Sequence, residues 1–130
     1  EGIIPGGGIA LLLASKALEN FKGDTDEVTG VHIVKRALRA PIMQIAENAG
    51  VDGAVVVDKV LNEKEGVGYD ADAGKYVNMV KAGIIDPKMV TRSALENAAS
   101  IAGIFLTMEC AVSEIPEEKK GDHSHGGMDM

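Results

Sequence analysis

Three adjacent glycines near the start of the chain could form a ligand-binding corner. Gly6, Gly7 and Gly8 lie between Pro5 and an apolar run that begins at Ile9. A glycine inside a helix or strand costs about 0.5–1 kcal/mol relative to alanine, so three in a row indicate a backbone with positive φ or a close approach by another group. Their N–H groups would lie at the positive end of the following helix, where electron-rich ligand groups are favoured. A simple turn before a buried helix is the alternative.

Three carboxylates are the other candidates for chemistry. Asp86 precedes Pro87, and this pair predicts a helix start with aspartate as the N-cap and proline at the first position. A capping carboxylate can still accept a hydrogen bond from a ligand hydroxyl through its second oxygen. Asp70 and Asp72 fall in a predicted turn, where turn chemistry is the simpler explanation. The sequence shows no Gly-x-Ser-x-Gly motif and no Walker lysine after the glycines.

The composition excludes several function classes. A chain of 130 residues with 45% hydrophobic and 25% charged residues is typical of one globular domain. A net charge of −7 disfavours nucleic acid as a partner. The longest apolar run, residues 9–14, is much shorter than the roughly 20 residues of a membrane span. The single cysteine, Cys110, indicates a reducing compartment, and we interpret it as a small apolar residue of a strand.

The elements that must position the candidate residues are mainly helical. Apolar residues on nearly all sides of residues 8–18 predict a central buried helix. Asp24 and Glu27 predict a capping box for a second helix, with Val28, Val31, Val34 and Leu38 on its buried face. Further helices are predicted from Pro41 to Gly50 and after Asp52, although the second of these is so rich in valine that a strand is conceivable.

The second half of the chain predicts a hairpin, a long helix and a strand. Two extended pieces flank a turn at residues 71–74. The longest helix follows Pro87, and its small residues would let the first helix pack closely against it. Residues 109–115 alternate as a strand does, and Pro116 would end it. This strand has no partner of matching length in the chain, so we expect it to pair with other sequence or another subunit.

The chain is expected to divide at Pro116. Residues 1–116 form the predicted domain, and residues 117–130 form a flexible tail because they are charged and rich in glycine. His123 and His125 could bind a metal loosely, but a solvated tail explains them more simply. The chain begins with Glu1 rather than methionine and has no basic leader, which predicts a piece of a longer protein without a signal peptide.

In combination, these segments resemble the group I chaperonins, the GroEL family. The resemblance covers nearly the whole chain in order, and it rests on residues 1–8, 40–41, 45–50, 68–71, 83–87, 91–95 and 126–128. It implies a mainly α fold: a multihelical bundle like a chaperonin equatorial domain, with a small β-hairpin and a C-terminal strand. Residues 1–116 would be the C-terminal half of that domain, which binds ATP and builds the ring.

The resemblance also implies which residues contact the nucleotide. A glycine of the triple-glycine turn would contact it, the hairpin segment would lie against the base, and the aspartate before proline would bind the ribose hydroxyls. These residues are Gly6, Gly7, Asp70, Ala71, Asp72 and Asp86. The family's phosphate loop, metal-binding aspartate and catalytic aspartate would lie upstream of Glu1. We therefore expect no catalytic residue and no metal ligand here, with ATP or ADP and Mg²⁺ bound only in the full-length protein.

The function implied by the resemblance is ATP-dependent protein folding. Expected partners are the rest of the same chain, identical subunits in a ring, a co-chaperonin and unfolded client proteins, without nucleic acid or membrane. A bacterial cytoplasm is the expected location, with an organelle matrix as the alternative. The competing hypothesis is a helical interaction or scaffold domain without a nucleotide role. If the other half of the domain is missing, exposed apolar faces on the first and last helices would favour self-association.

Overall fold

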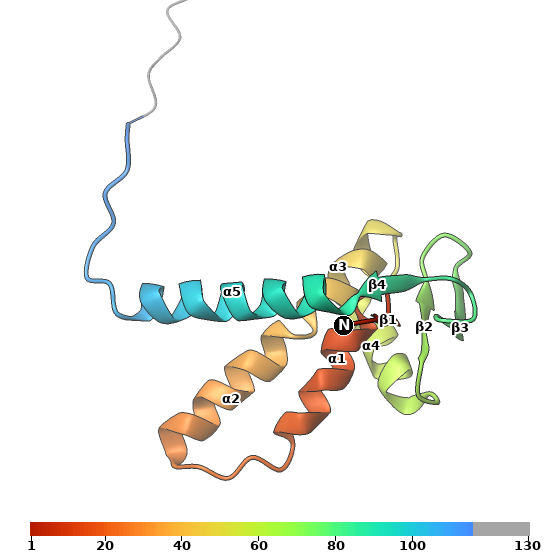
Figure 1. The fold of residues 1–130 in the computed structure, drawn as a ribbon, viewed down its shortest axis with the longest axis horizontal. Coiled ribbons are helices and arrows are strands. Elements are labelled where there is room, and N and C mark those ends of the chain that lie inside the picture. The colour runs from red at the N-terminus through yellow and green to blue at the C-terminus, as the bar shows by residue number, and fades with distance from the viewer. Residues whose placement is uncertain (116–130) are drawn as a thin grey trace, which may run out of the picture.

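A computed structural model describes residues 1–115 of the chain, and the predicted tail with His123 and His125 lies outside this range. Helices dominate the fold, so the predicted mainly α class is confirmed (Figure 1). In chain order the elements are β1 (Ile3–Pro5), α1 (Ile9–Ala14), the 3₁₀ helix η1 (Ser15–Leu18), α2 (Thr25–Ala37), α3 (Ala40–Asn48), α4 (Gly53–Asn62), β2 (Val67–Asp70), β3 (Lys75–Asn78), β4 (Ile85–Pro87) and α5 (Lys88–Leu106).

Two small antiparallel strand pairs accompany the helices. β2 and β3 form the predicted hairpin, with Asp70 opposite Lys75 beside the turn. β1 pairs with β4, so that Ile4 lies opposite Asp86. The sequence did not indicate this second pair, because each strand has only three residues and the two strands lie far apart in the sequence. The β1–β4 pair therefore brings the start of the chain beside the segment that leads into α5.

The hydrophobic core lies among α1, α3, α4 and the hairpin. Its buried members are Ile9, Leu12, Ile42, Ala46, Val56, Val57, Val60, Tyr69 and Met79. The first helix is less buried than predicted, since its buried residues are Ile9 and Leu12 and they share one face. The prediction of a helix buried on all sides was therefore wrong for the described residues: α3 and α4 cover only one side of α1.

Local capping follows the sequence closely. The Asp24 carboxylate accepts hydrogen bonds from the backbone N–H groups of Asp26 and Glu27, at 3.0 and 2.9 Å, and the Glu27 carboxylate accepts one from the Asp24 N–H at 3.1 Å. The predicted capping box of α2 is thus confirmed. Asp52 caps α4 by accepting hydrogen bonds from the backbone N–H groups of Ala54 and Val55, and the valine-rich segment that follows is confirmed as a helix. Each such cap contributes about 1 kcal/mol.

The start of α5 differs from the prediction. The helix begins at Lys88, Pro87 is its N-cap residue, and the cap makes no side-chain hydrogen bond. Asp86 belongs to β4 instead, because pairing with Ile4 of β1 holds its backbone in an extended conformation. The prediction that Asp86 caps the helix was therefore wrong. Its carboxylate makes no capping hydrogen bond to the first turn of α5.

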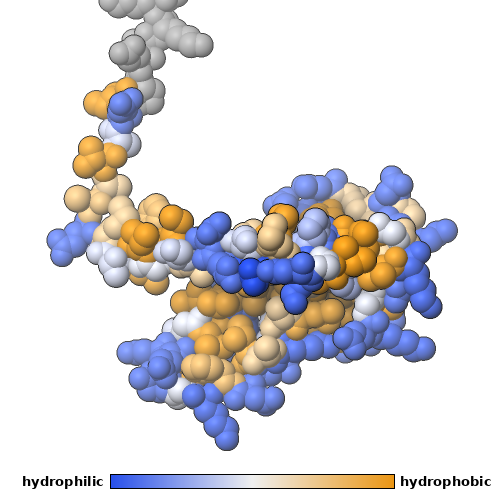
Figure 2. Space-filling view, viewed as in Figure 1, coloured by the Kyte–Doolittle hydropathy of each residue, from blue (hydrophilic) through white to orange (hydrophobic). Residues whose placement is uncertain are grey.

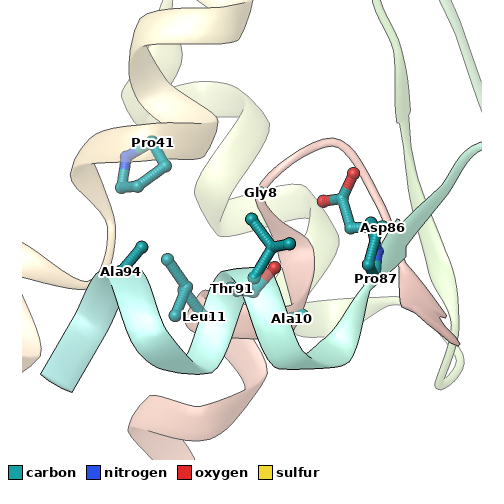
Figure 3. Close-up of a pocket in the computed structure, with 9 residues that line it drawn as sticks. Gly8, Ala10, Leu11, Pro41, Asp86, Pro87, Thr91 and Ala94 are labelled. Carbon is teal, nitrogen blue, oxygen red and sulfur yellow. The ribbon is translucent and has the colours of Figure 1, made fainter. Parts of the chain in front are cut away.

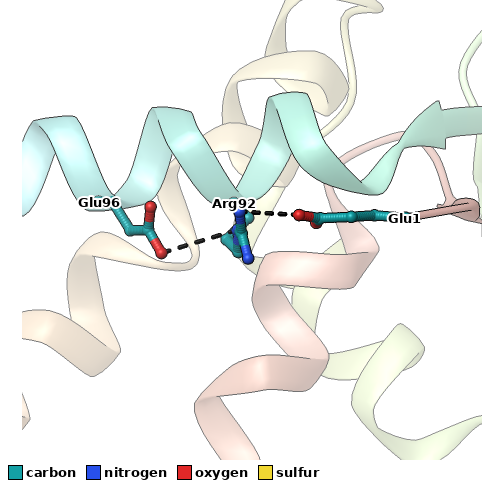
Figure 4. Close-up of polar contacts among 3 residues, drawn as sticks. All are labelled: Glu1, Arg92 and Glu96. Atoms are coloured by element: carbon teal, nitrogen blue, oxygen red, sulfur yellow. Dashed lines mark ion pairs between the residues drawn. The ribbon is translucent and has the colours of Figure 1, made fainter.

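α5 is the longest helix, as predicted, but it extends away from the core (Figure 1). Within the described residues, no α5 side chain is buried, and α5 does not pack closely along α1 as predicted, because the start of α1 and the first turns of α5 line a common cavity. Arg92 ties this end of the helix to the start of the chain, through an ion pair of 2.8 Å from its Nη2 to Oε1 of Glu1 (Figure 4). Arg92 Nε also lies 3.7 Å from Oε1 of Glu96.

Large apolar side chains are exposed on the two helices that leave the core. On α2, Val34 of the predicted buried face is 45% exposed, and on α5 Phe105 and Leu106 are 64% and 88% exposed. Figure 2 shows apolar surface over α2 and at the far end of α5. Even so, no helix within residues 1–115 is both long and apolar enough to cross a bilayer.

The predicted C-terminal strand is absent from the described residues. Residues 109–115 have no regular secondary structure, and Val112 is 97% exposed. Cys110 is exposed as well, contrary to its interpretation as an apolar residue of a strand. The physical reason is that a strand needs a partner for its backbone hydrogen bonds, and no strand edge of the described chain lies beside this segment.

Candidate functional site

The glycine bend and Asp86 lie side by side. The Gly6 N–H donates a hydrogen bond to the Ile84 carbonyl at 2.9 Å, which continues the contact between β1 and β4. A Cβ atom added at Gly6 would lie 3.2 Å from Oδ1 of Asp86 and 3.2 Å from the Ile84 carbonyl carbon. The missing side chain is what lets the two segments approach. Figure 3 shows the Asp86 carboxylate directed toward the bend between β1 and α1.

The next two glycines combine the two features that the sequence suggested, a positive φ and a close approach by another group. Gly7 and Gly8 have φ values of +70° and +79°, in the left-handed region that favours glycine. Each is also closely approached: an added Cβ would lie 2.6 Å from Met79 Cε at Gly7 and 2.7 Å from the Ile42 backbone nitrogen at Gly8. The bend is therefore a tight turn that is also packed against α3 and the segment after β3.

The hairpin supplies a further edge of the same region. The Tyr69 carbonyl oxygen would lie 3.8 Å from a Cβ atom added at Gly7. The next residue, Asp70, accepts hydrogen bonds through Oδ1 from the backbone N–H groups of Asp72 and Ala73, at 3.1 and 3.2 Å. Asp70 thus has the turn role considered from the sequence. Asp72 is exposed in that turn, whereas Ala71 is half-buried against the core.

A cavity of about 330 Å³ opens next to Asp86, between the start of α1 and the first turns of α5. Its lining includes Gly8, Leu11, Pro41, Asp86, Val90 and Thr91 (Figure 3). Asp86 is its one ionisable lining residue. A largely apolar hollow with one carboxylate suits the nonpolar face of a small organic ligand that also presents hydroxyl donors. Sequence reasoning missed Pro41, Val90 and Thr91, because helical spacing alone does not reveal that α3, α1 and α5 converge here.

An aromatic cluster on the hairpin was also not predicted. The Tyr69 and Tyr76 rings lie 5.3 Å apart between centroids, and Lys59 Nζ lies 4.0 Å from the Tyr76 ring centroid. Burial raises the pKa of the Tyr76 hydroxyl above its ordinary value of 10.0, and the charges of Tyr69 and Glu63 add to this. This cluster stabilises the hairpin, which in turn supports the glycine bend.

The described residues do not gather metal ligands. Among residues 1–115, no three histidine, cysteine, aspartate or glutamate side chains come close enough together to hold an ion. The Asp86 carboxylate can accept hydrogen bonds, and the bend can admit a ligand close to the backbone.

The described residues form a mainly helical protein in which a glycine bend and one carboxylate lie beside a cavity. Residues 1–116 match the TCP-1/cpn60 chaperonin family, and the chain therefore belongs to that family. The resemblance seen in the sequence is confirmed at this level. The chaperonins are a class of protein that assists protein folding and in general assembles into rings that act on client proteins.

Proposed function

We propose that this chain is the C-terminal half of a group I chaperonin equatorial domain, and that it forms the base and ribose side of an ATP pocket. The observation that carries the proposal is the contact between the Gly6 bend and the Asp86 carboxylate. Two segments that are far apart in the sequence meet there, one without side chains and one with a hydrogen-bond acceptor. A ribose presents two adjacent hydroxyl donors, and an ionised carboxylate is the matching acceptor.

The carboxylate also determines which part of a nucleotide can lie there. A negative group repels phosphates, so Asp86 favours the sugar and the phosphates must point away from it. The chain as a whole carries a net charge of −7, which gives little attraction for a triphosphate. In this proposal the phosphates and Mg²⁺ are bound by residues from another part of the full-length protein, which also supplies the catalytic groups.

The exposed apolar surface supports a role within a larger assembly. Ile101, Phe105 and Leu106 are more than half exposed on α5. Apolar surface of this kind is usually covered by a partner. We propose that other parts of the same chain and neighbouring subunits cover it in the ring, and that residues 109–115 become a strand when such a partner is present.

The same surface favours a second candidate function. A helical scaffold or interaction domain would also expose apolar side chains on α5, without any need for a nucleotide. The two candidates differ in what they require of Asp86. Only the nucleotide proposal needs its carboxylate, because the scaffold proposal assigns it no ligand.

Calorimetric titration of the full-length protein with ADP separates the candidates. Asp86→Ala should weaken ADP binding by at least about tenfold, since a hydrogen bond to a charged group contributes about 1.5–3 kcal/mol. Asp58→Ala is the matched control, because Asp58 is an exposed carboxylate on α4. This control should leave ADP affinity unchanged. Wild-type affinity in the Asp86→Ala variant would refute the nucleotide proposal and leave the scaffold function.

A further inference from the structure

Met79 lies at the point where the hairpin, the glycine bend and the segment leading to β4 meet. It follows β3 directly, and its side chain is 0% exposed. It does not line the cavity beside Asp86. We propose that Met79 is a positioning residue of the nucleoside site, which sets the separation between the glycine bend and the hairpin. This inference rests on the nucleotide function proposed above.

The side chain of Met79 fills the space left by two glycines. A Cβ atom added at Gly7 would lie 2.6 Å from Met79 Cε, and one added at Gly68 would lie 2.8 Å from Cγ and 3.0 Å from Sδ. These distances are shorter than ordinary van der Waals contacts, so a side chain at Gly68 would collide with the middle of Met79, and one at Gly7 would displace its terminal methyl. Methionine is unbranched and flexible, which suits a gap between two irregular backbone segments. The terminal methyl faces the bend and the middle of the side chain faces β2.

The backbone of Met79 joins the same segments. Its N–H donates to the Gly66 carbonyl at 3.0 Å, just before β2, and its carbonyl accepts from the Ile84 N–H at 2.8 Å. The Ile84 carbonyl in turn accepts from the Gly6 N–H at 2.9 Å. Three hydrogen bonds therefore run in series from the hairpin through Met79 and Ile84 to the bend.

This arrangement couples Met79 to both sides of the proposed ribose slot. Its side chain contacts the region of Gly7 directly, and its carbonyl holds Ile84, two residues before Asp86. Loss of the side chain would let the bend move toward the hairpin and would change the separation of Gly7 from Asp86. A shift of about 1 Å in a positioning group can lower activity by about 100-fold. The loss of affinity should concern the base and ribose of a nucleotide and not its phosphates.

The test compares variants of the full-length protein in calorimetric titrations with ADP and with inorganic triphosphate. Met79→Ala should weaken ADP binding by about tenfold or more and leave triphosphate binding unchanged. Leu12→Ala is the matched control, because Leu12 is also 0% exposed in the same core. It should lower stability to a similar degree but change ADP affinity by less than about twofold. Met79→Leu retains most of the buried volume but lacks a terminal methyl that reaches Gly7, so it should weaken ADP binding by about threefold.

The possible outcomes distinguish a failure of the role proposed for Met79 from a failure of the nucleotide function on which it rests. Equal ADP affinity in Met79→Ala and Leu12→Ala would overturn the role of Met79, while a loss in Asp86→Ala would still support the nucleotide site. Equal weakening of ADP and triphosphate by Met79→Ala would also overturn it, because general damage to the fold would then be the cause. If Met79→Ala does not fold, Met79→Leu decides, and unchanged ADP affinity would count against the inference. Failure of the wild-type protein to bind ADP would refute the proposed function itself.

Discussion

Gly8 and Gly50 offer a direct test of how tightly the glycine bend is packed. Both have left-handed backbones, with φ values of +79° and +76°. An alanine at either position should incur about 1–2 kcal/mol of backbone strain, partly offset by about 0.4–1 kcal/mol from the reduced entropy of the unfolded chain. The two substitutions share these contributions. They differ only in what the new methyl group would meet.

The surroundings of the two glycines differ sharply. A Cβ atom at Gly50 would have nothing within 4 Å, whereas one at Gly8 would lie 2.7 Å from the Ile42 backbone nitrogen and 2.9 Å from its Cα. Backbone atoms of α3 cannot move aside as a flexible side chain can, and overpacking of this kind typically costs about 1–3 kcal/mol. Gly8→Ala should therefore destabilise the fold by about 1–3 kcal/mol more than Gly50→Ala.

Urea denaturation followed by circular dichroism measures this difference. Both variants should unfold at lower urea concentrations than the wild-type protein, and Gly8→Ala should have the lower midpoint of the two. The slope of the transition should stay the same, since neither change alters how much surface unfolding exposes. Equal midpoints for the two variants would show that α3 does not press against the bend, and the packing argument for the site would fail.

Three further predictions concern the elements around the site. Asp24→Ala should lower the free energy of unfolding by about 1 kcal/mol, because the capping box of α2 is lost, and urea denaturation would show it. Because the pKa of Tyr76 is raised, the folded protein keeps the hydroxyl proton at pH values where the unfolded chain releases it. The contribution of Tyr76 to stability should therefore be constant below about pH 10 and fall above it. Thermal unfolding measured against pH should show a smaller fall in Tyr76→Phe. Arg92→Ala should cost at most about 1 kcal/mol at low salt and nothing measurable near 1 M NaCl, because the ion pair with Glu1 is exposed.

Several features followed from the sequence because they depend on neighbouring residues. The Asp24 and Glu27 capping box, the Asp52 cap and the hairpin turn all arise from groups within four positions of one another. The valine-rich segment after Asp52 is a helix as predicted, since Val56, Val57 and Val60 fall on one face that packs in the core. Family membership also followed from the sequence, because short segments in a fixed order carry it.

Predictions that needed distant partners were less successful. The strand expected at residues 109–115 is absent, because the described chain offers it no edge to pair with. The helix α5 lies near α1 only at its first turns and does not pack along it as predicted, so apolar side chains such as Phe105 are exposed. In both cases the local pattern is present, but the burial or pairing depends on surfaces that the pattern does not specify.

The sequence by itself determined the mainly helical class, the caps of α2 and α4, the hairpin and the family, since backbone hydrogen bonds and turn preferences act over a few residues. Only the tertiary structure decided that Asp86 lies in a strand opposite Ile4 and faces Gly6 instead of capping α5. Pairing between two three-residue strands has almost no sequence signal, because its hydrogen bonds involve the backbone alone. The long-range packing of α3 and Met79 against the glycines then fixes this meeting point.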